Sequence, residues 1–163
     1  MNNRRIATGA VLTSLALIFS YVEFLVPIPL GIPGIKLGLA NIIIVFALYM
    51  LDAKYAFAIN IVRITLSGLL FGSVFSIFYA LAGGLLSLLA MFLAKKTNLF
   101  SVCGVSMAGG VFHNLGQILV AMIVVATPQV LLYFPVLIFA GIATGIVNGI
   151  LATLIMSRLK KRK

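Results

Sequence analysis

Acidic residues, histidine and cysteine are all scarce in this chain, and their scarcity limits its chemistry. Its 163 residues include two acids in total, one histidine and one cysteine. A lone cysteine forms no disulfide within the chain and no multi-cysteine metal motif. One histidine, one cysteine and two distant acids give no convergent set of metal ligands. The sequence therefore predicts no metal site, and no cofactor is expected.

Charged residues of either sign are also few. They make up 9% of the chain, whereas hydrophobic residues make up 63%, and both values lie far outside those of soluble proteins. A soluble globule could not cover its surface with so few charges. The composition predicts an all-α integral membrane protein, and the length suits one transmembrane domain over residues 1–163.

Long apolar segments divide the chain into helices. A bilayer core takes about 20 helical residues. Prolines and glycines exclude a regular helix over 26–34, and Thr127-Pro128-Gln129 marks another turn. Six transmembrane helices are predicted, at about 6–25, 36–51, 55–70, 74–94, 100–126 and 130–157.

Ten of the twelve basic residues lie at the edges of these segments. Basic residues gather on the cytoplasmic face of a bilayer. Alternation through six helices from a cytoplasmic start places all ten on that side, so both termini are predicted to be cytoplasmic. Membrane topology and attraction to anionic lipid headgroups explain this charge better than nucleic-acid binding does. The ten residues are Arg4, Arg5, Lys54, Lys95, Lys96, Arg158, Lys160, Lys161, Arg162 and Lys163.

Small residues recur every four positions in three of the predicted helices. This spacing lets helix backbones approach closely in lipid. Most such stripes pack within their own chain, which we expect here, with the first helix as a candidate exception. The stripes are Ala10 and Ser14, Ala80 and Gly84, and Gly141, Gly145 and Gly149.

The two basic residues away from the edges are Lys36 and Arg63, and charges within the membrane are usually functional. Arg63 lies eight residues into the predicted third helix, about 12 Å from its end, and Asn60 shares its face. Arg63 is either a structural arginine bound by Asn60 and helix-end carbonyls, or the counter-charge of an anionic ligand. Because neither acid, Glu23 or Asp52, is predicted at the same depth, we favour the interpretation in which Arg63 binds an anionic ligand.

Lys36 is predicted to open the second helix on the outer side, where helix N-termini favour anions. An ion pair with Glu23, near the outer end of the first helix, is an equally good interpretation. Asn41, five residues later, is either a ligand contact or an interhelical hydrogen-bonding residue.

His113, Asn114 and Gln117 form a polar group on the predicted fifth helix, with His113 and Gln117 four residues apart. A lone histidine is more often a hydrogen-bonded core residue than a ligand contact. The neighbouring amides make a ligand-binding role equally plausible.

Several motifs, taken in order, resemble one family over nearly the whole chain. They resemble the bacterial membrane proteins labelled heptaprenyl diphosphate synthase component I, also called the Gx transporter family. The motifs are Pro27-Ile28-Pro29, Pro33-Gly34-Ile35-Lys36-Leu37-Gly38-Leu39-Ala40-Asn41, Leu70-Phe71-Gly72-Ser73, Tyr79-Ala80-Leu81-Ala82-Gly83-Gly84-Leu85-Leu86-Ser87 and His113-Asn114-Leu115-Gly116-Gln117.

That family in turn resembles the substrate-binding S components of energy-coupling factor (ECF) transporters. These six-helix proteins of the bacterial plasma membrane capture a small molecule outside the cell, and work with a transmembrane coupling subunit and two ATPases. The resemblance implies an ECF S-component-like bundle and an anionic, partly hydrophobic substrate: an isoprenoid phosphate, a quinone precursor or a vitamin. It implies a coupling-subunit contact at Ala10 and Ser14, where serine replaces the second alanine of the family's patch. The candidate ligand contacts are Lys36, Asn41, Asn60, Arg63, His113, Asn114 and Gln117.

The synthase label disagrees with the residues. Prenyl diphosphate synthases hold Mg²⁺ through aspartate-rich motifs, because magnesium binds carboxylates and phosphate oxygens. One Asp and one Glu, predicted on opposite faces of the membrane, cannot build that site. We expect no enzymatic activity, with ATP hydrolysis supplied by partner subunits. The alternative is a non-catalytic membrane subunit or anchor of a prenyl diphosphate synthase.

Overall fold

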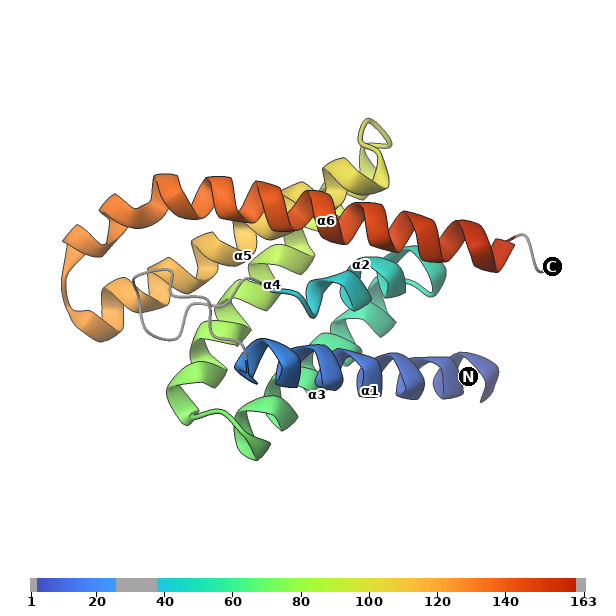
Figure 1. Cartoon of the computed structure of the whole chain (residues 1–163), viewed down its shortest axis with the longest axis horizontal. Helices are drawn as coiled ribbons and strands as arrows, with labels where there is room; N and C mark the ends of the chain where they lie inside the picture. Colours follow the sequence, from blue (N-terminus) through green and yellow to red (C-terminus); the bar gives the residue numbers. More distant parts are fainter. Residues whose placement is uncertain (1–2, 26–37, 161–163) are drawn as a thin grey trace.

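The computed structural model describes residues 3–25 and 38–160, and within these ranges the chain is all-helical (Figure 1). Every predicted helix is present in it. Five helical segments are long and apolar enough to cross a membrane. The helices are α1 (Asn3–Leu25), α2 (Asn41–Met50), α3 (Ala53–Leu70), α4 (Val74–Lys96), α5 (Val102–Val125) and α6 (Phe134–Lys160), with a 3₁₀ helix, η1 (Pro128–Tyr133), before α6.

The second helix differs most from its prediction. It was expected as a short transmembrane helix over 36–51, but it begins at Asn41 and has 10 residues, about 15 Å at 1.5 Å per residue. A bilayer core is about 30 Å thick, so α2 alone is too short to cross it. Gly38 explains the late start, because its φ of 79° is left-handed and cannot belong to a right-handed helix.

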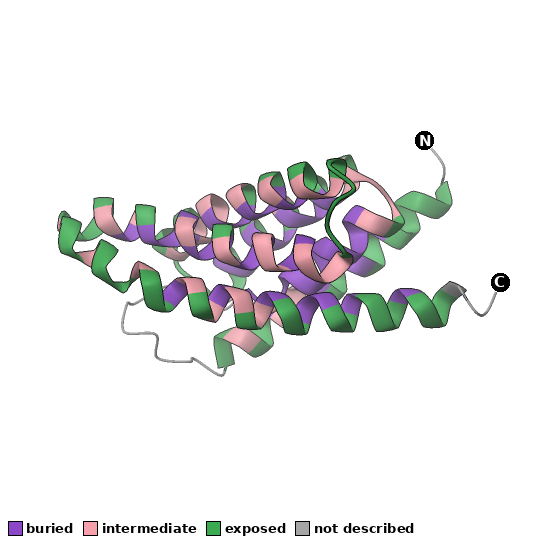
Figure 2. Cartoon of the chain, turned by 90° about the horizontal axis from the view of Figure 1, so that it is seen from above, coloured by how far each residue is buried: buried purple, intermediate pink, exposed green. Residues whose placement is uncertain are grey.

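Most residues of α2 are buried inside the bundle. Eight of its ten residues are buried, from Asn41 to Leu48. An apolar run of this length fits a core helix as well as a membrane span. Figure 2 shows that buried residues concentrate on the inner faces of the helices, while the outward faces are exposed.

The sixth helix also begins later than predicted. Residues 128–133 form the 3₁₀ helix η1, and α6 begins at Phe134 instead of residue 130. Pro135 is the second residue of α6. Proline suits the first turn of a helix and would break its interior, since it has no N–H group to donate.

The glycine stripe of α6 packs against α5, which confirms its predicted role within the chain. A Cβ atom added at Gly145 would lie 2.5 Å from the Met107 Cα, and one at Gly149 would lie 2.6 Å from the Cys103 Cα. At Gly141 it would lie 2.7 Å from the Gly110 carbonyl oxygen. No side chain fits at these points, so glycine is what brings the two backbones together.

Basic residues from several helices share one end of the bundle, where α1 begins and α6 ends (Figure 1). There Arg5 of α1 pairs with Asp52 at 3.6 Å. Lys95 of α4 donates to the Leu48 carbonyl oxygen at 2.6 Å. The Arg5–Asp52 pair is exposed and contributes little stability, but it shows that the start of α1 lies beside the start of α3.

Candidate functional site: a buried polar cluster

Polar side chains from all six helices are buried inside this apolar bundle. Burying a polar group is costly unless it is hydrogen-bonded, so their number calls for an explanation. They are Ser20, Asn41, Asn60, Arg63, Ser67, Ser87, Ser106, His113, Asn114, Gln117 and Asn148.

Arg63 joins three helices. Its side chain is 5% exposed. Nε and Nη2 donate to Asn60 Oδ1 at 3.2 and 2.9 Å, and Nη2 also donates to Asn41 Oδ1 at 3.3 Å. Nη1 lies 3.5 Å from the Ser20 hydroxyl oxygen. The predicted Asn60 partnership is therefore present, and Asn41 makes the interhelical hydrogen bond that was one of its two interpretations.

Sequence analysis did not place an acid beside Arg63, but the structure brings one near it. Glu23 lies close enough to Arg63 for the two charges to interact. Ser20 of α1 contacts Arg63, and Glu23 is one helical turn further along the same face. The guanidinium therefore has neutral hydrogen-bond acceptors around it and a carboxylate nearby.

Gly38 is a junction between elements. Its N–H donates to Glu23 Oε1 at 2.6 Å. Its carbonyl oxygen accepts from Asn148 Nδ2 of α6 at 3.2 Å and from the Asn41 N–H at 3.0 Å. Gly38, three residues before α2, is thus bound to α1 and α6.

The imidazole of His113 lies between two glycines. A Cβ atom added at Gly38 would lie 3.1 Å from His113 Cδ2, and one at Gly83 would lie 3.1 Å from His113 Cε1. The same atom at Gly83 would lie 3.0 Å from Gln117 Cγ, and one at the neighbouring Gly84 would lie 2.8 Å from Asn60 Nδ2. The two glycines of α4 thus bring His113 and Gln117 of α5 toward Asn60 of α3.

We call this group the polar cluster. It brings together five of the seven predicted ligand contacts and adds four residues that were not predicted as ligand contacts: Ser20, Glu23, Gly38 and Asn148. Lys36 and the predicted loop 26–34 lie outside the described residues. The polar cluster consists of Ser20, Glu23, Gly38, Asn41, Asn60, Arg63, His113, Gln117 and Asn148.

Asn114 lies outside the polar cluster and contacts α6 instead. Its Nδ2 donates to the Leu137 carbonyl oxygen of α6 at 2.8 Å, a bond that fixes α5 to α6. Within residues 3–25 and 38–160, the buried atoms Asn60 Nδ2, Ser87 Oγ and Asn114 Oδ1 have no hydrogen-bond partner. A buried polar atom left in this state costs about 1–3 kcal/mol.

The four cluster residues that were missed carry weak sequence signals. Ser20 is one of several serines inside apolar segments. Asn148 is a single amide in a long apolar segment, and Gly38 is one of several glycines near the prolines. Glu23 was considered as a partner of Lys36 and was set aside as a partner of Arg63. In the described part of the chain, no group of three or more His, Cys, Asp or Glu side chains is placed to hold a metal ion.

An all-helical bundle with an apolar exterior, five long apolar helices and a buried polar interior is a multi-pass membrane protein. The family model for heptaprenyl diphosphate synthase component I matches residues 12–155, so the chain belongs to that family and the predicted resemblance is confirmed. Searches of curated proteins and of solved structures found no significant match.

Proposed function

We propose that the chain is the substrate-binding S component of an ECF-type importer in the bacterial plasma membrane. It would capture a small, anionic and partly hydrophobic nutrient or precursor from the outer side, such as an isoprenoid or quinone-related compound. The polar cluster is the observation that supports this most. A buried arginine that is hydrogen-bonded to two amides and a serine, with a carboxylate nearby, is costly in a membrane protein and is typical of a substrate pathway.

The chemistry of the cluster favours an anion with a polar edge. Arg63 carries a planar fork of donors that suits carboxylates and phosphates. Its hydrogen-bond acceptors within the cluster are neutral oxygens, and an anionic ligand would bind more strongly than these. Glu23 accepts a hydrogen bond from the Gly38 N–H, which holds that carboxylate in position.

Mass spectrometry of small molecules released from the purified chain tests this function. We expect one anionic compound in near-stoichiometric amount after gentle detergent extraction and denaturation. Recovery of only bulk lipid and detergent would count against a substrate-binding role. As an S component the chain would not be an enzyme, and ATP hydrolysis would belong to partner subunits.

Threading of the chain gives a separate prediction. In a Cys103→Ser background, a cysteine at Gln129 should react with an impermeant thiol reagent added to intact cells, and one at Lys96 should not. Both positions are exposed in the structure, so burial does not decide the result. Labelling at Lys96 from outside would contradict cytoplasmic termini.

The coupling contact is proposed for α1, where Ala10 and Ser14 are both exposed. The Ser14 hydroxyl donates to the Ala10 carbonyl oxygen at 3.2 Å, so it is used within its own helix. What remains on this face is a smooth surface of small side chains, suited to close packing with another helix.

Ala10→Trp should therefore abolish co-purification of the coupling subunit while the released ligand stays at the wild-type amount. The indole would prevent close approach of a partner helix, but it would lie outside the bundle. Val22→Trp is the control, since Val22 is 43% exposed on α1 three turns further along. If Ala10→Trp loses ligand and partner together, the position serves internal packing and the docking proposal fails.

The family's description supports one alternative, a non-catalytic membrane subunit or anchor of a prenyl diphosphate synthase. This role needs no buried ligand site. It predicts a soluble synthase as the principal partner.

A further inference from the structure

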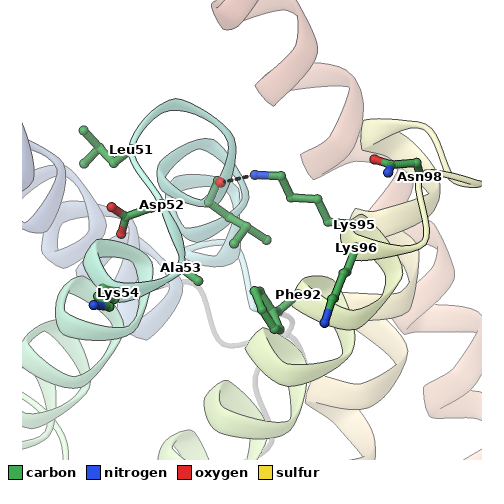
Figure 3. Close-up of a pocket in the computed structure, with 9 residues that line it drawn as sticks. Leu51, Asp52, Ala53, Lys54, Phe92, Lys95, Lys96 and Asn98 are labelled. Atoms are coloured by element: carbon green, nitrogen blue, oxygen red, sulfur yellow. Dashed lines mark hydrogen bonds between the residues drawn. The ribbon is translucent and has the colours of Figure 1, made fainter.

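A cleft opens at the basic end of the bundle, between the α2–α3 corner and the end of α4 (Figure 3). Its volume is about 800 Å³. Asp52 and Lys54 line it on one side, and Lys95 and Lys96 on the other, with Phe92 between them. None of its lining residues belongs to the polar cluster.

The cleft carries net positive charge. The Asp52 carboxylate accepts from the Tyr55 N–H at 3.0 Å and pairs with Arg5 at 3.6 Å, so Arg5 balances it. Lys54, Lys95 and Lys96 then leave three positive charges at the cleft.

Lys95 is held in position across the cleft. Its ammonium group donates to the Leu48 carbonyl oxygen and lies 4.6 Å from the centre of the Tyr49 ring. Figure 3 shows the side chain extended from the end of α4 toward α2. A carbonyl oxygen and a ring do not neutralise an ammonium group, so its charge remains available to an anion.

An apolar groove continues from this cleft between α3 and α4. It has a volume of about 330 Å³ and is lined by Ala53, Phe57, Leu85, Leu88, Leu89 and Phe92. Ala53 and Phe92 line both spaces, so the charged cleft and the groove adjoin. From Phe92 to Leu85 the groove follows α4 for about 10 Å toward the bundle's other end.

We propose that this continuous space binds a single-chain membrane amphiphile with a phosphate head group. The phosphate would bind Lys95 and Lys96, with Lys54 nearby, and the hydrocarbon chain would lie in the groove. Charge complementarity favours this occupant: a neutral lipid would leave the lysines unused, and a free anion would leave the groove empty. Both volumes fall in the range of small-molecule sites, about 300–1,000 Å³. The site is separate from the polar cluster and does not depend on the importer function.

Dodecyl phosphate is the probe for this site, titrated onto the full-length chain in dodecyl maltoside and followed by native mass spectrometry. We expect one saturable binding event that dodecanol and inorganic phosphate do not reproduce. Lys96→Gln, at an exposed position, should weaken binding roughly fivefold, as expected for loss of one basic residue at a membrane surface. Arg158→Gln removes a charge at the same end outside the cleft and should have little effect.

Leu89→Trp tests the groove, because the indole would occupy the space assigned to the chain, and saturable binding should be lost. Leu93→Trp is the matched control, since both leucines are 53% exposed on α4 and only Leu89 lines the groove. Equal effects of the two tryptophans, equal effects of the two glutamines, or dodecanol binding as tightly as dodecyl phosphate would each overturn the proposal. So would a two-chain phosphatidate that binds the Leu89→Trp protein unchanged, which would indicate nonspecific surface lipid.

Discussion

Arg63→Gln is expected to lower the anionic compound released from the purified chain by well over tenfold, while the protein stays folded. Removal of one partner of a buried charge pair typically costs about 2–5 kcal/mol of binding. The fold should survive, because glutamine can still hydrogen-bond Asn60 and a costly buried charge has gone. The measurements are ligand per mole of protein and the thermal melting temperature in the same detergent.

Arg63→Lys is the matched variant, since it keeps the charge and loses the planar fork. We expect it to retain more ligand than Arg63→Gln and less than wild type. The structural interpretation predicts something different, because Arg63 also joins α3 to Asn41 of α2 and Ser20 of α1. If Arg63→Gln keeps its ligand but melts far below wild type, Arg63 is a structural residue and the anion site loses its main support.

Gly38→Ala should both destabilise the chain and remove its ligand. The left-handed φ of 79° is strained for any residue with a Cβ atom, at about 1–2 kcal/mol. The added atom would also lie 2.8 Å from Asn41 Nδ2 and 3.1 Å from His113 Cδ2, so both side chains would have to move. Because Gly38 also binds Glu23 and Asn148, the change would spread through the polar cluster.

Gly104→Ala is the control for this substitution. There a Cβ atom would meet only the Phe100 side chain, at 3.4 Å, within α5 at an ordinary helical φ. Alanine favours helix over glycine by about 1 kcal/mol, so Gly104→Ala should melt at or above the wild-type temperature with its ligand retained. A Gly38→Ala protein that matched Gly104→Ala in both measurements would show that the Gly38 junction is unimportant.

The helices could be predicted because most of them are long apolar segments with clear ends. Length and composition identify such segments without knowledge of their neighbours. α2 was the exception, since its apolar residues pack against other helices and the left-handed Gly38 shortens it. Composition predicts neither which helices will surround a segment nor the backbone angle of a particular glycine.

The polar cluster could be predicted only where its contacts are local. Asn60 and Arg63 are three residues apart on one helix, so their contact follows from helical spacing. The Asn148–Gly38 hydrogen bond joins residues 110 positions apart, and the approach of Glu23 to Arg63 depends on how α1 packs. Such contacts are set by the arrangement of the helices. The sequence around Asn148 therefore gave no sign that Gly38 is its partner.

Affinity purification of the tagged full-length chain from its native cells, in mild detergent, tests the importer role most directly. Proteins recovered with it would be identified by mass spectrometry, with Ala10→Trp purified in parallel. Our account predicts a transmembrane coupling subunit and two ATPases with the wild-type chain, and their loss from Ala10→Trp. Recovery of a prenyl diphosphate synthase subunit alone, in equal amount from both proteins, would contradict it.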